Sequence, residues 1–232
     1  MTRRYFIAGT DTGVGKTTLT EALIRAARAQ AIDAIGLKPI ETGCGEEGIA
    51  QDADCLARAS DAPDLAHIEG FYRARNPLAP LAATFEGEAP PPPIARLAET
   101  IRAADAHREL SFIEAAGGLL VPYDTNHQVA DLALELGATL ILVAADRLGT
   151  LSSTLTAIES AEKRKLPIQF IILSGTESPD FSSRTNLEVL RQTRPEYPIL
   201  PFPYLSNLPD RIDAAKRILE RLERGHRAPR SS

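Results

Sequence analysis

The glycine-rich segment at residues 9–18 is the feature that most constrains the fold of this chain. It reads GTDTGVGKTT, follows a short apolar segment at residues 5–8, and opens an amphipathic stretch. A strand that feeds such a loop aims successive backbone N–H groups, and the positive end of the next helix, at one point. Proteins hold phosphate chains in this way. The segment therefore predicts a phosphate-binding loop between a strand and a helix.

Two side chains of this loop have expected roles. Lys16 is expected to reach the β- and γ-phosphates of a nucleotide, and the Thr17 hydroxyl is expected to bind Mg²⁺. The general pattern places a glycine at position 10, where this chain has Thr10. An accidental glycine turn is the alternative, and the Gly-Lys-Thr-Thr sequence argues against it. Further nucleotide contacts are expected from Gly13, Val14, Gly15 and Thr18.

A dinucleotide-binding loop is a second alternative for the same segment. Its fingerprint needs a third glycine three residues after Gly15, and the chain has Thr18 there. NAD is therefore disfavoured as a ligand.

Short apolar runs alternate with helical patterns along the rest of the chain. This alternation is typical of βαβ units with helices on both faces of a sheet, so we expect an α/β, single-domain P-loop fold with a mostly parallel sheet. The expected strands are residues 5–8, 35–38, 111–114, 140–144, 168–173 and 199–202. The expected helices are residues 16–30, 94–108, 129–136, 150–163, 185–192 and 211–224.

The length of 232 residues suits one α/β domain, which we assign to residues 1–224. Four consecutive prolines at residues 90–93 are expected to form a stiff surface connection. A domain boundary there is the alternative, but it would leave each half with too small a sheet. The polar segment at residues 225–232 is predicted to be a disordered tail.

Composition narrows the class of partner. The formal charge of −5 provides no basic footprint for nucleic acid or an anionic membrane, and no apolar run is long enough for a membrane helix. The N-terminus shows no signal-peptide pattern, so we expect a cytoplasmic protein. Cys44 and Cys55 lack the spacing of a zinc site or a disulfide framework. A small-molecule substrate is the better expectation.

Carboxylates are the expected partners of a magnesium-bound nucleotide, because hard cations prefer oxygen ligands. Glu114 ends a buried-type strand and precedes a small-residue loop, which is where a metal-binding acid of this fold class stands. Asp52 and Asp54 are further candidates, although such residues more often mark the N-terminus of a helix. Lys38 ends the second expected strand, at the sheet edge where α/β proteins bind ligands. A solvated lysine is the alternative reading of that position.

The chain resembles the dethiobiotin synthetase family over nearly its whole length. That family carries G-T-D-T-x-V-G-K-T, which residues 9–17 match, including the threonine that departs from the general pattern. Further matches follow in the same order along the chain. They are KPIETGC at residues 38–44, DA at 52–53, NPLAP at 76–80, EAAGGL at 114–119, LGTL at 148–151 and PYL at 203–205.

The resemblance implies a reaction in which 7,8-diaminopelargonic acid and CO₂ form a carbamate, ATP phosphorylates it, and the neighbouring amine closes a ureido ring. It implies catalytic roles for Lys16, Lys38 and Thr12, and Mg²⁺ bound by Thr17, Asp52 and Glu114. The implied substrate contacts are Thr12, Lys38, Thr42, Gly117, Gly118 and Leu119. The family is homodimeric, with the diamine near the subunit interface.

Three positions depart from the family pattern. Ser174 stands where an asparagine usually reads the nucleobase, so adenine selectivity is open, although Ser174 and Pro203 remain the expected base contacts. Ser152 and Ser153 replace a common Asn-His pair, which weakens the expectation of contacts across a dimer. Gly13 replaces a frequent glutamate.

Two other functions share this loop architecture. A dimerising switch ATPase of the partition or septum-site type would carry an extra lysine early in the loop, and residues 10–12 contain none. A glutamine-dependent amide synthase of the corrinoid pathway would need a glutaminase domain. Both are weaker alternatives than ring closure.

Overall fold

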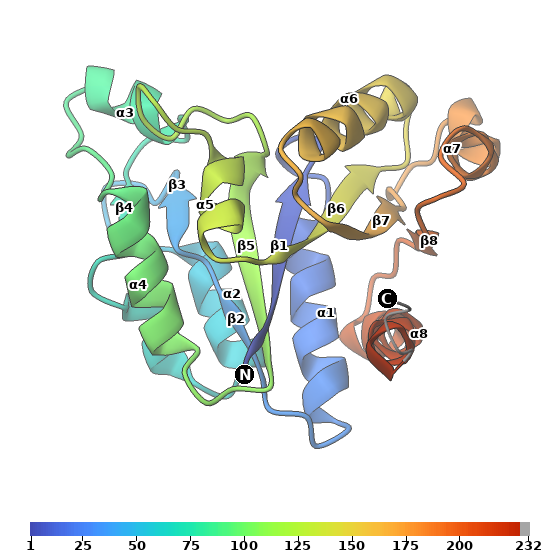
Figure 1. Cartoon of the computed structure of the whole chain (residues 1–232), viewed down its shortest axis with the longest axis horizontal. Coiled ribbons are helices and arrows are strands. Elements are labelled where there is room, and N and C mark those ends of the chain that lie inside the picture. The colour runs from blue at the N-terminus through green and yellow to red at the C-terminus, as the bar shows by residue number, and fades with distance from the viewer. Residues whose placement is uncertain (228–232) are drawn as a thin grey trace.

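A six-stranded sheet, with every strand parallel to its neighbours, forms the centre of the protein (Figure 1). The computed structural model describes residues 1–227. The strand order is β2-β5-β1-β6-β7-β8. The strands are β1 (Arg3–Gly9), β2 (Ala34–Leu37), β5 (Leu110–Gly118), β6 (Thr139–Ala145), β7 (Ile168–Ser174) and β8 (Ile199–Phe202).

All six predicted strands are confirmed, as is the α/β fold class with a mostly parallel sheet. The predicted bounds are close because central parallel strands are buried on both faces and read as continuous apolar runs. The one sizeable difference is β5, which continues past Glu114 to Gly118. Its small residues carry no apolar signal, but Gly118 still pairs with Gly9 beside the phosphate loop.

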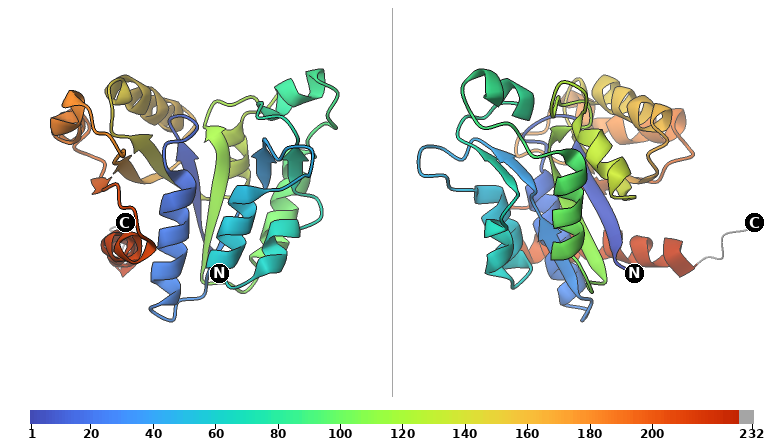
Figure 2. Two further views of the ribbon diagram at one scale, coloured as in Figure 1. Left: turned by 180° about the vertical axis from the view of Figure 1, so that it is seen from behind. Right: turned by 60° about the vertical axis from the view of Figure 1, so that its left-hand side comes forward.

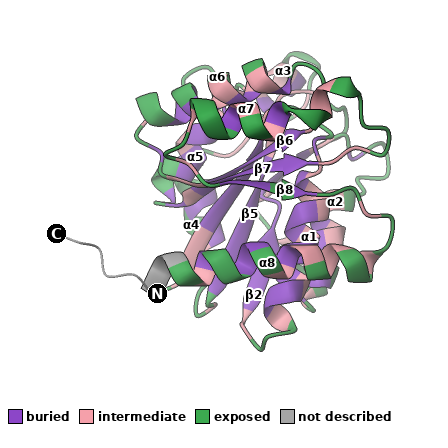
Figure 3. Cartoon of the chain, turned by 90° about the vertical axis from the view of Figure 1, so that its right-hand side faces the viewer, coloured by how far each residue is buried: buried purple, intermediate pink, exposed green. Residues whose placement is uncertain are grey.

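Two layers of helices cover the sheet (Figure 3). Alternate residues of β1 face opposite layers: Tyr5 and Ile7 pack with one core cluster, and Phe6 and Ala8 pack with the other. One layer contains α1 (Lys16–Arg28), α2 (Gln51–Ala59) and α8 (Leu208–Arg227), which lie in front of the sheet when it is seen from behind (Figure 2, left). The other contains α4 (Ile94–Ala104), α5 (Val129–Glu135), α6 (Thr150–Lys163) and α7 (Asn186–Thr193).

Several short elements were not predicted. A two-stranded parallel sheet pairs β3 with β4, and α2 and α3 precede the proline run. Helix α2 has nine residues, and the sequence indicated it only through Asp52 and Asp54 as residues that often mark a helix N-terminus. The other elements are too short for a periodic pattern. They are β3 (Ile40–Thr42), β4 (Tyr72–Ala74), α3 (Pro80–Phe85) and the 3₁₀ helices η1 (Pro63–His67) and η2 (Phe181–Arg184).

The prolines at residues 90–93 lie between α3 and α4 without secondary structure. Strand β2, before them, pairs directly with β5, after them, so the prolines connect parts of one sheet. Helix α8 runs to Arg227, and the prediction of a disordered tail is therefore wrong for residues 225–227. The helical pattern continues there because no proline intervenes until Pro229. The rest of the predicted tail, residues 228–232, lies outside the described residues.

The topology places the phosphate loop at the carboxyl edge of the sheet. Strand β1 lies between β5 and β6, and the chain leaves its carboxyl end to enter the loop and α1. Open α/β sheets bind ligands at such a position, where neighbouring strands connect in opposite directions. Within residues 1–227, the helices are too short or too polar to cross a lipid bilayer.

Candidate functional site

The phosphate loop contains backbone conformations that favour glycine. Gly13 and Gly15 have φ values of 68° and 95°, in the left-handed region. A Cβ atom at Gly15 would lie 2.7 Å from the Ser174 hydroxyl oxygen, and one at Gly9 would lie 2.5 Å from the carbonyl oxygen of Asp11. Helix α1 begins immediately afterwards without a side-chain cap. Its first N–H groups are therefore available to an anion.

Lys16 folds back across this loop. Its side chain is buried, and its Nζ donates a hydrogen bond to the Asp11 carbonyl oxygen at 3.1 Å. Burial and the charge of Lys38 lower the pKa of Lys16. A nearby anion such as a phosphate would relieve both effects, because it stabilises the charged ammonium.

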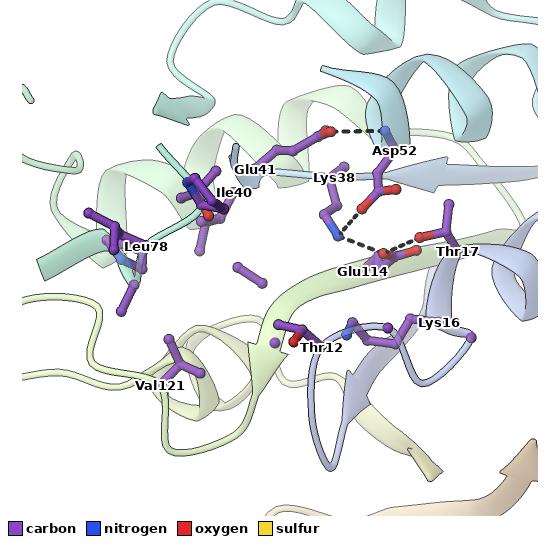
Figure 4. Close-up of a pocket in the computed structure, with 18 of the residues that line it drawn as sticks. Thr12, Lys16, Thr17, Lys38, Ile40, Glu41, Asp52, Leu78, Glu114 and Val121 are labelled. Carbon is purple, nitrogen blue, oxygen red and sulfur yellow. Dashed lines mark hydrogen bonds and ion pairs between the residues drawn. The ribbon is translucent and has the colours of Figure 1, made fainter. Parts of the chain in front are cut away.

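Lys38 joins two carboxylates from different elements (Figure 4). Its Nζ lies 2.6 Å from Glu114 Oε1 and 2.9 Å from Asp52 Oδ2, and it also donates to the Ala115 carbonyl oxygen at 3.3 Å. The Thr17 hydroxyl donates to Glu114 Oε1 at 2.8 Å. The structure therefore brings Thr17, Lys38, Asp52 and Glu114 together, although they come from α1, the end of β2, α2 and β5.

Burial shapes the charges of this cluster. Glu114 is 0% exposed and Lys38 is 5% exposed. Burial alone would lower the pKa of Lys38, but Glu114 and Asp52 outweigh it, and that pKa is raised. Burial alone would raise the pKa of Asp52, but Lys38 and hydrogen bonds from Lys38 and Thr17 outweigh it, and that pKa is lowered. These shifts favour the charged forms of Lys38 and Asp52.

The donor set of the cluster suits a hard divalent cation. The second carboxylate oxygen of Glu114, Oε2, is buried without a hydrogen-bond partner. Thr17 and Asp52 supply further oxygen atoms next to the same ammonium. Magnesium takes few protein ligands and completes its shell with water and phosphate oxygens. The described part of the chain contains no group of three or more His, Cys, Asp or Glu residues able to hold a metal.

A cavity of about 480 Å³ opens beside this cluster. Thr12, Lys16, Lys38, Thr42 and Gly117 line it, so five of the residues predicted for catalysis or substrate binding share one space. Its opposite end is apolar, as Figure 4 shows. That end is formed by Ile40, Leu78 and Val121.

Two predicted substrate contacts lie elsewhere. Gly118 and Leu119 line a separate cavity of about 500 Å³, which shares Thr12 and Gly117 with the first. This second cavity is bounded on its other side by Ser153 and further residues of α6. The predicted substrate residues therefore divide between two adjoining spaces.

A third cavity, of about 390 Å³, begins at the other side of the phosphate loop. Six of the eight residues predicted to bind the nucleotide line this third cavity: Gly13, Val14, Gly15, Thr18, Ser174 and Pro203. The other two, Lys16 and Thr17, line the first cavity. Sequence reasoning missed Thr176, whose hydroxyl oxygen is buried in the structure without a hydrogen-bond partner. Its position just beyond β7, at the carboxyl edge of the sheet, is the signal that points to it.

Glu41 is another functional candidate to which the sequence interpretation assigned no role. Its two carboxylate oxygens each accept a backbone hydrogen bond, from Asp52 and from Ala53, both at 2.9 Å. The KPIETGC segment contains Glu41 between two predicted site residues, Lys38 and Thr42. That position was the available signal, but α2, the helix that Glu41 contacts, was not among the helices expected from periodicity.

Comparison with known proteins covers almost the entire chain. The protein family described as an AAA domain matches residues 3–213. The ATP-dependent dethiobiotin synthetase BioD of Anaeromyxobacter dehalogenans (strain 2CP-C) is 38% identical over 219 residues, which cover 94% of this chain and 97% of that protein.

Solved structures share the fold at low sequence identity. Cobyrinic acid a,c-diamide synthase from Mycobacterium smegmatis, with bound ADP and magnesium, has a TM-score of 0.58 at 17% identity and covers 99% of this chain and 97% of its own. The cell division ATPase MinD of Pyrococcus furiosus has a TM-score of 0.58 at 16% identity, with coverages of 97% and 99%. At these identities the similarity shows the fold alone.

Proposed function

Because this chain belongs to the ATP-dependent dethiobiotin synthetases, we propose that it closes the ureido ring of dethiobiotin from 7,8-diaminopelargonic acid and CO₂. ATP is consumed to ADP and phosphate, and the product serves biotin biosynthesis. One observation carries the proposal beyond family membership. Lys16 and Lys38 line the same cavity, each beside the groups that a phosphoryl transfer requires. Lys16 binds the nucleotide, and Lys38 binds a second anion, the carbamate.

The proposed chemistry has three balanced steps. One amine of the substrate adds to CO₂ and loses a proton, which gives a carbamate. A carbamate oxygen then attacks the γ-phosphorus of ATP, and ADP leaves. The second amine attacks the carbonyl carbon of the resulting carbamic-phosphoric anhydride, a proton is lost, and phosphate leaves as the ring closes.

The side chains of the cavity divide this work. Lys16, beside the loop N–H groups, holds the γ-phosphoryl group as negative charge shifts onto it, which lowers the barrier electrostatically. Lys38 neutralises the carbamate and aims it at phosphorus. The hydroxyls of Thr12 and Thr42, which both line the cavity, orient the substrate.

Thr17, Asp52 and Glu114 would hold Mg²⁺, which would neutralise charge on the nucleotide phosphates. The buried, unpartnered oxygen of Glu114 supports this assignment.

The second cavity supports the remaining substrate contacts. Gly117 lines both cavities, Gly118 and Leu119 line the second, and all three are proposed to hold the carbamate and its neighbouring carbons. We also propose a homodimer in which the partner closes this side. Leu120, 45% exposed at the mouth of the second cavity, supports that arrangement. Sedimentation of the purified protein tests it, and a monomer at assay concentration would contradict it.

A cytoplasmic location belongs to the same proposal. The reaction consumes ATP, so it needs a compartment that supplies the nucleotide. Fractionation of cells that produce the protein would test this, and recovery outside the cytoplasm would contradict it.

The decisive experiment is phosphate release by the purified protein with Mg-ATP and bicarbonate. We expect release only when 7,8-diaminopelargonic acid is present, with formation of one dethiobiotin for each phosphate. Turnover without the diamine that rises on addition of DNA or lipid vesicles would favour a switch ATPase instead. The fold similarity to MinD does not favour that alternative, because residues 10–12 lack the extra lysine.

A further inference from the structure

We propose that Glu41 is a positioning residue for metal binding: it caps the start of helix α2 from a neighbouring strand and so holds Asp52 against Lys38. The inference rests on the proposed magnesium site, because Asp52 is one of its ligands. It adds a residue that is not itself a proposed metal ligand but determines where one ligand stands.

The start of α2 lacks a cap of its own. The N-cap position is Ala50, which makes no side-chain hydrogen bond to the helix. The amides that an N-cap side chain normally satisfies are those of the second and third helical residues. In α2, which begins at Gln51, these are Asp52 and Ala53.

Glu41 satisfies both of these amides. Its Oε1 accepts from the Asp52 N–H and its Oε2 accepts from the Ala53 N–H, each at 2.9 Å. A carboxylate at a helix N-terminus also gains from the helix dipole, and hydrogen bonds to a charged acceptor are stronger than neutral ones. Glu41 therefore acts as a bidentate cap that comes from β3 instead of from the helix itself.

The burial of Glu41 shows that this cap is costly to build. The residue is 7% exposed, and within residues 1–227 it forms no ion pair. Burying a carboxylate is unfavourable unless hydrogen bonds compensate it. A serine at position 50, where Ala50 is buried in a small apolar cluster, would cap α2 with a neutral hydroxyl and without burying a charge, so helix stability alone does not account for Glu41.

What Glu41 adds is a connection between two parts of the site. It lies in β3 three residues after Lys38, and β3 pairs with β4 at Glu41 and Arg73. The Arg73 guanidinium donates to the Lys38 carbonyl oxygen at 2.9 Å, which ties β4 to the segment that carries Lys38. Glu41 extends this framework to the first turn of α2. Asp52 Oδ2 is thereby held 2.9 Å from Lys38 Nζ.

The substitution Glu41→Gln tests the proposal. The glutamine side chain keeps one oxygen that can accept a hydrogen bond from α2. Its NH₂ group takes the place of the second oxygen and faces a backbone N–H of the helix, so one hydrogen bond is lost and two donors repel each other. We expect the affinity of the enzyme–ADP complex for Mg²⁺, measured by calorimetry, to fall about tenfold, as for other residues that support metal ligands. ADP affinity in EDTA should stay unchanged. Glu46→Gln, at a site that is 82% exposed, is the matched control and should leave both affinities unchanged.

A double-mutant cycle with Asp52→Asn separates this inference from the proposed metal site. If Glu41 acts through Asp52, Glu41→Gln should change Mg²⁺ affinity little in the Asp52→Asn background. An equal loss in both backgrounds would overturn the role of Glu41, as would full Mg²⁺ affinity in Glu41→Gln. If Asp52→Asn alone binds Mg²⁺ normally, the proposed metal site fails instead.

Restoring the cap provides the second variant. In the double variant Glu41→Gln/Ala50→Ser, the serine stands at the N-cap position, and its hydroxyl oxygen accepts a hydrogen bond from one of the two backbone N–H groups. We expect this pair to regain the thermal stability lost in Glu41→Gln while its Mg²⁺ affinity stays about tenfold low, because the serine caps α2 without connecting it to β3. Thermal unfolding would show that the pair is folded, including if Glu41→Gln alone folds poorly. A folded pair with wild-type Mg²⁺ affinity would show that capping alone is sufficient, and would overturn the role of Glu41 as a connection.

Discussion

The Lys38 ammonium lies 2.6 Å from the Glu114 carboxylate, and both groups are almost completely buried. Lys38 follows β2 and Glu114 lies within β5, its direct neighbour in the sheet. Their pairing concentrates the charges of the site at the carboxyl edge, next to the phosphate loop.

Replacing Lys38 by alanine should separate nucleotide binding from ring closure. The Lys38→Ala variant keeps the phosphate loop and Lys16, so ADP affinity in EDTA should remain near wild type. Diamine-dependent phosphate release should fall by about 10²–10³, which is typical of losing a group that stabilises transition-state charge. Unimpaired ring closure in this variant would remove Lys38 from the mechanism.

The Thr17 hydroxyl should matter only when metal is present. Thr17→Val is close to isosteric, but it removes the hydrogen bond to Glu114 Oε1 and one proposed oxygen ligand. We expect about tenfold weaker binding of Mg-ADP and unchanged binding of ADP in EDTA. Thr100→Val, on α4, is a suitable control, because Thr100 lines none of the three cavities. Metal titrations that match wild type would contradict the assignment of Thr17.

Gly15 should tolerate no side chain. Its φ of 95° is unfavourable for alanine, by about 1–2 kcal/mol, and the added Cβ would lie 2.7 Å from the Ser174 hydroxyl oxygen. Gly15→Ala should therefore lower the free energy of unfolding and weaken ADP binding at least tenfold. Combining it with Ser174→Ala should recover only part of the loss, because the backbone strain remains. Complete recovery would show that the close contact alone was responsible.

Ser174 should make the enzyme tolerant of different nucleobases. A hydroxyl rotates and serves as donor or acceptor, whereas an asparagine amide presents a fixed pair. We expect wild-type kcat/KM values for ATP, CTP and GTP within about tenfold of one another, since one hydrogen bond is worth about 1 kcal/mol. Ser174→Asn should shift the preference towards ATP. Strict ATP specificity in the wild type would show that other groups, with Thr176 the first candidate, read the base.

Asp52 should stabilise the fold in a pH-dependent way. Its pKa is lowered in the folded protein, so its contribution is complete above the ordinary aspartate value of about 3.9 and is lost as the pH falls towards the lower folded value. The free energy of unfolding in urea should therefore exceed that of Asp52→Asn by a constant amount between about pH 5 and 7. The difference should shrink below about pH 4. A difference that grows on acidification would have the wrong sign.

Local features of the sequence determined much of the architecture. The glycine loop, its lysine and its threonine are adjacent in the chain, and their spacing alone indicates how they meet a phosphate. The six strands were predictable because burial on both faces makes each one an apolar run of the right length. The ends of helices such as α6 followed from periodicity alone.

The tertiary structure decided which distant residues meet. Lys38 and Glu114 are separated by 76 positions, and only the pairing of β2 with β5 brings their side chains together. The cap that Glu41 provides for α2 was equally hidden, because it joins a three-residue strand to a helix that begins without a capping side chain. Periodicity reports how each segment is buried but not which segments pack together. Those contacts depend on the order of strands in the sheet, and that order is chosen by the packing of the whole core.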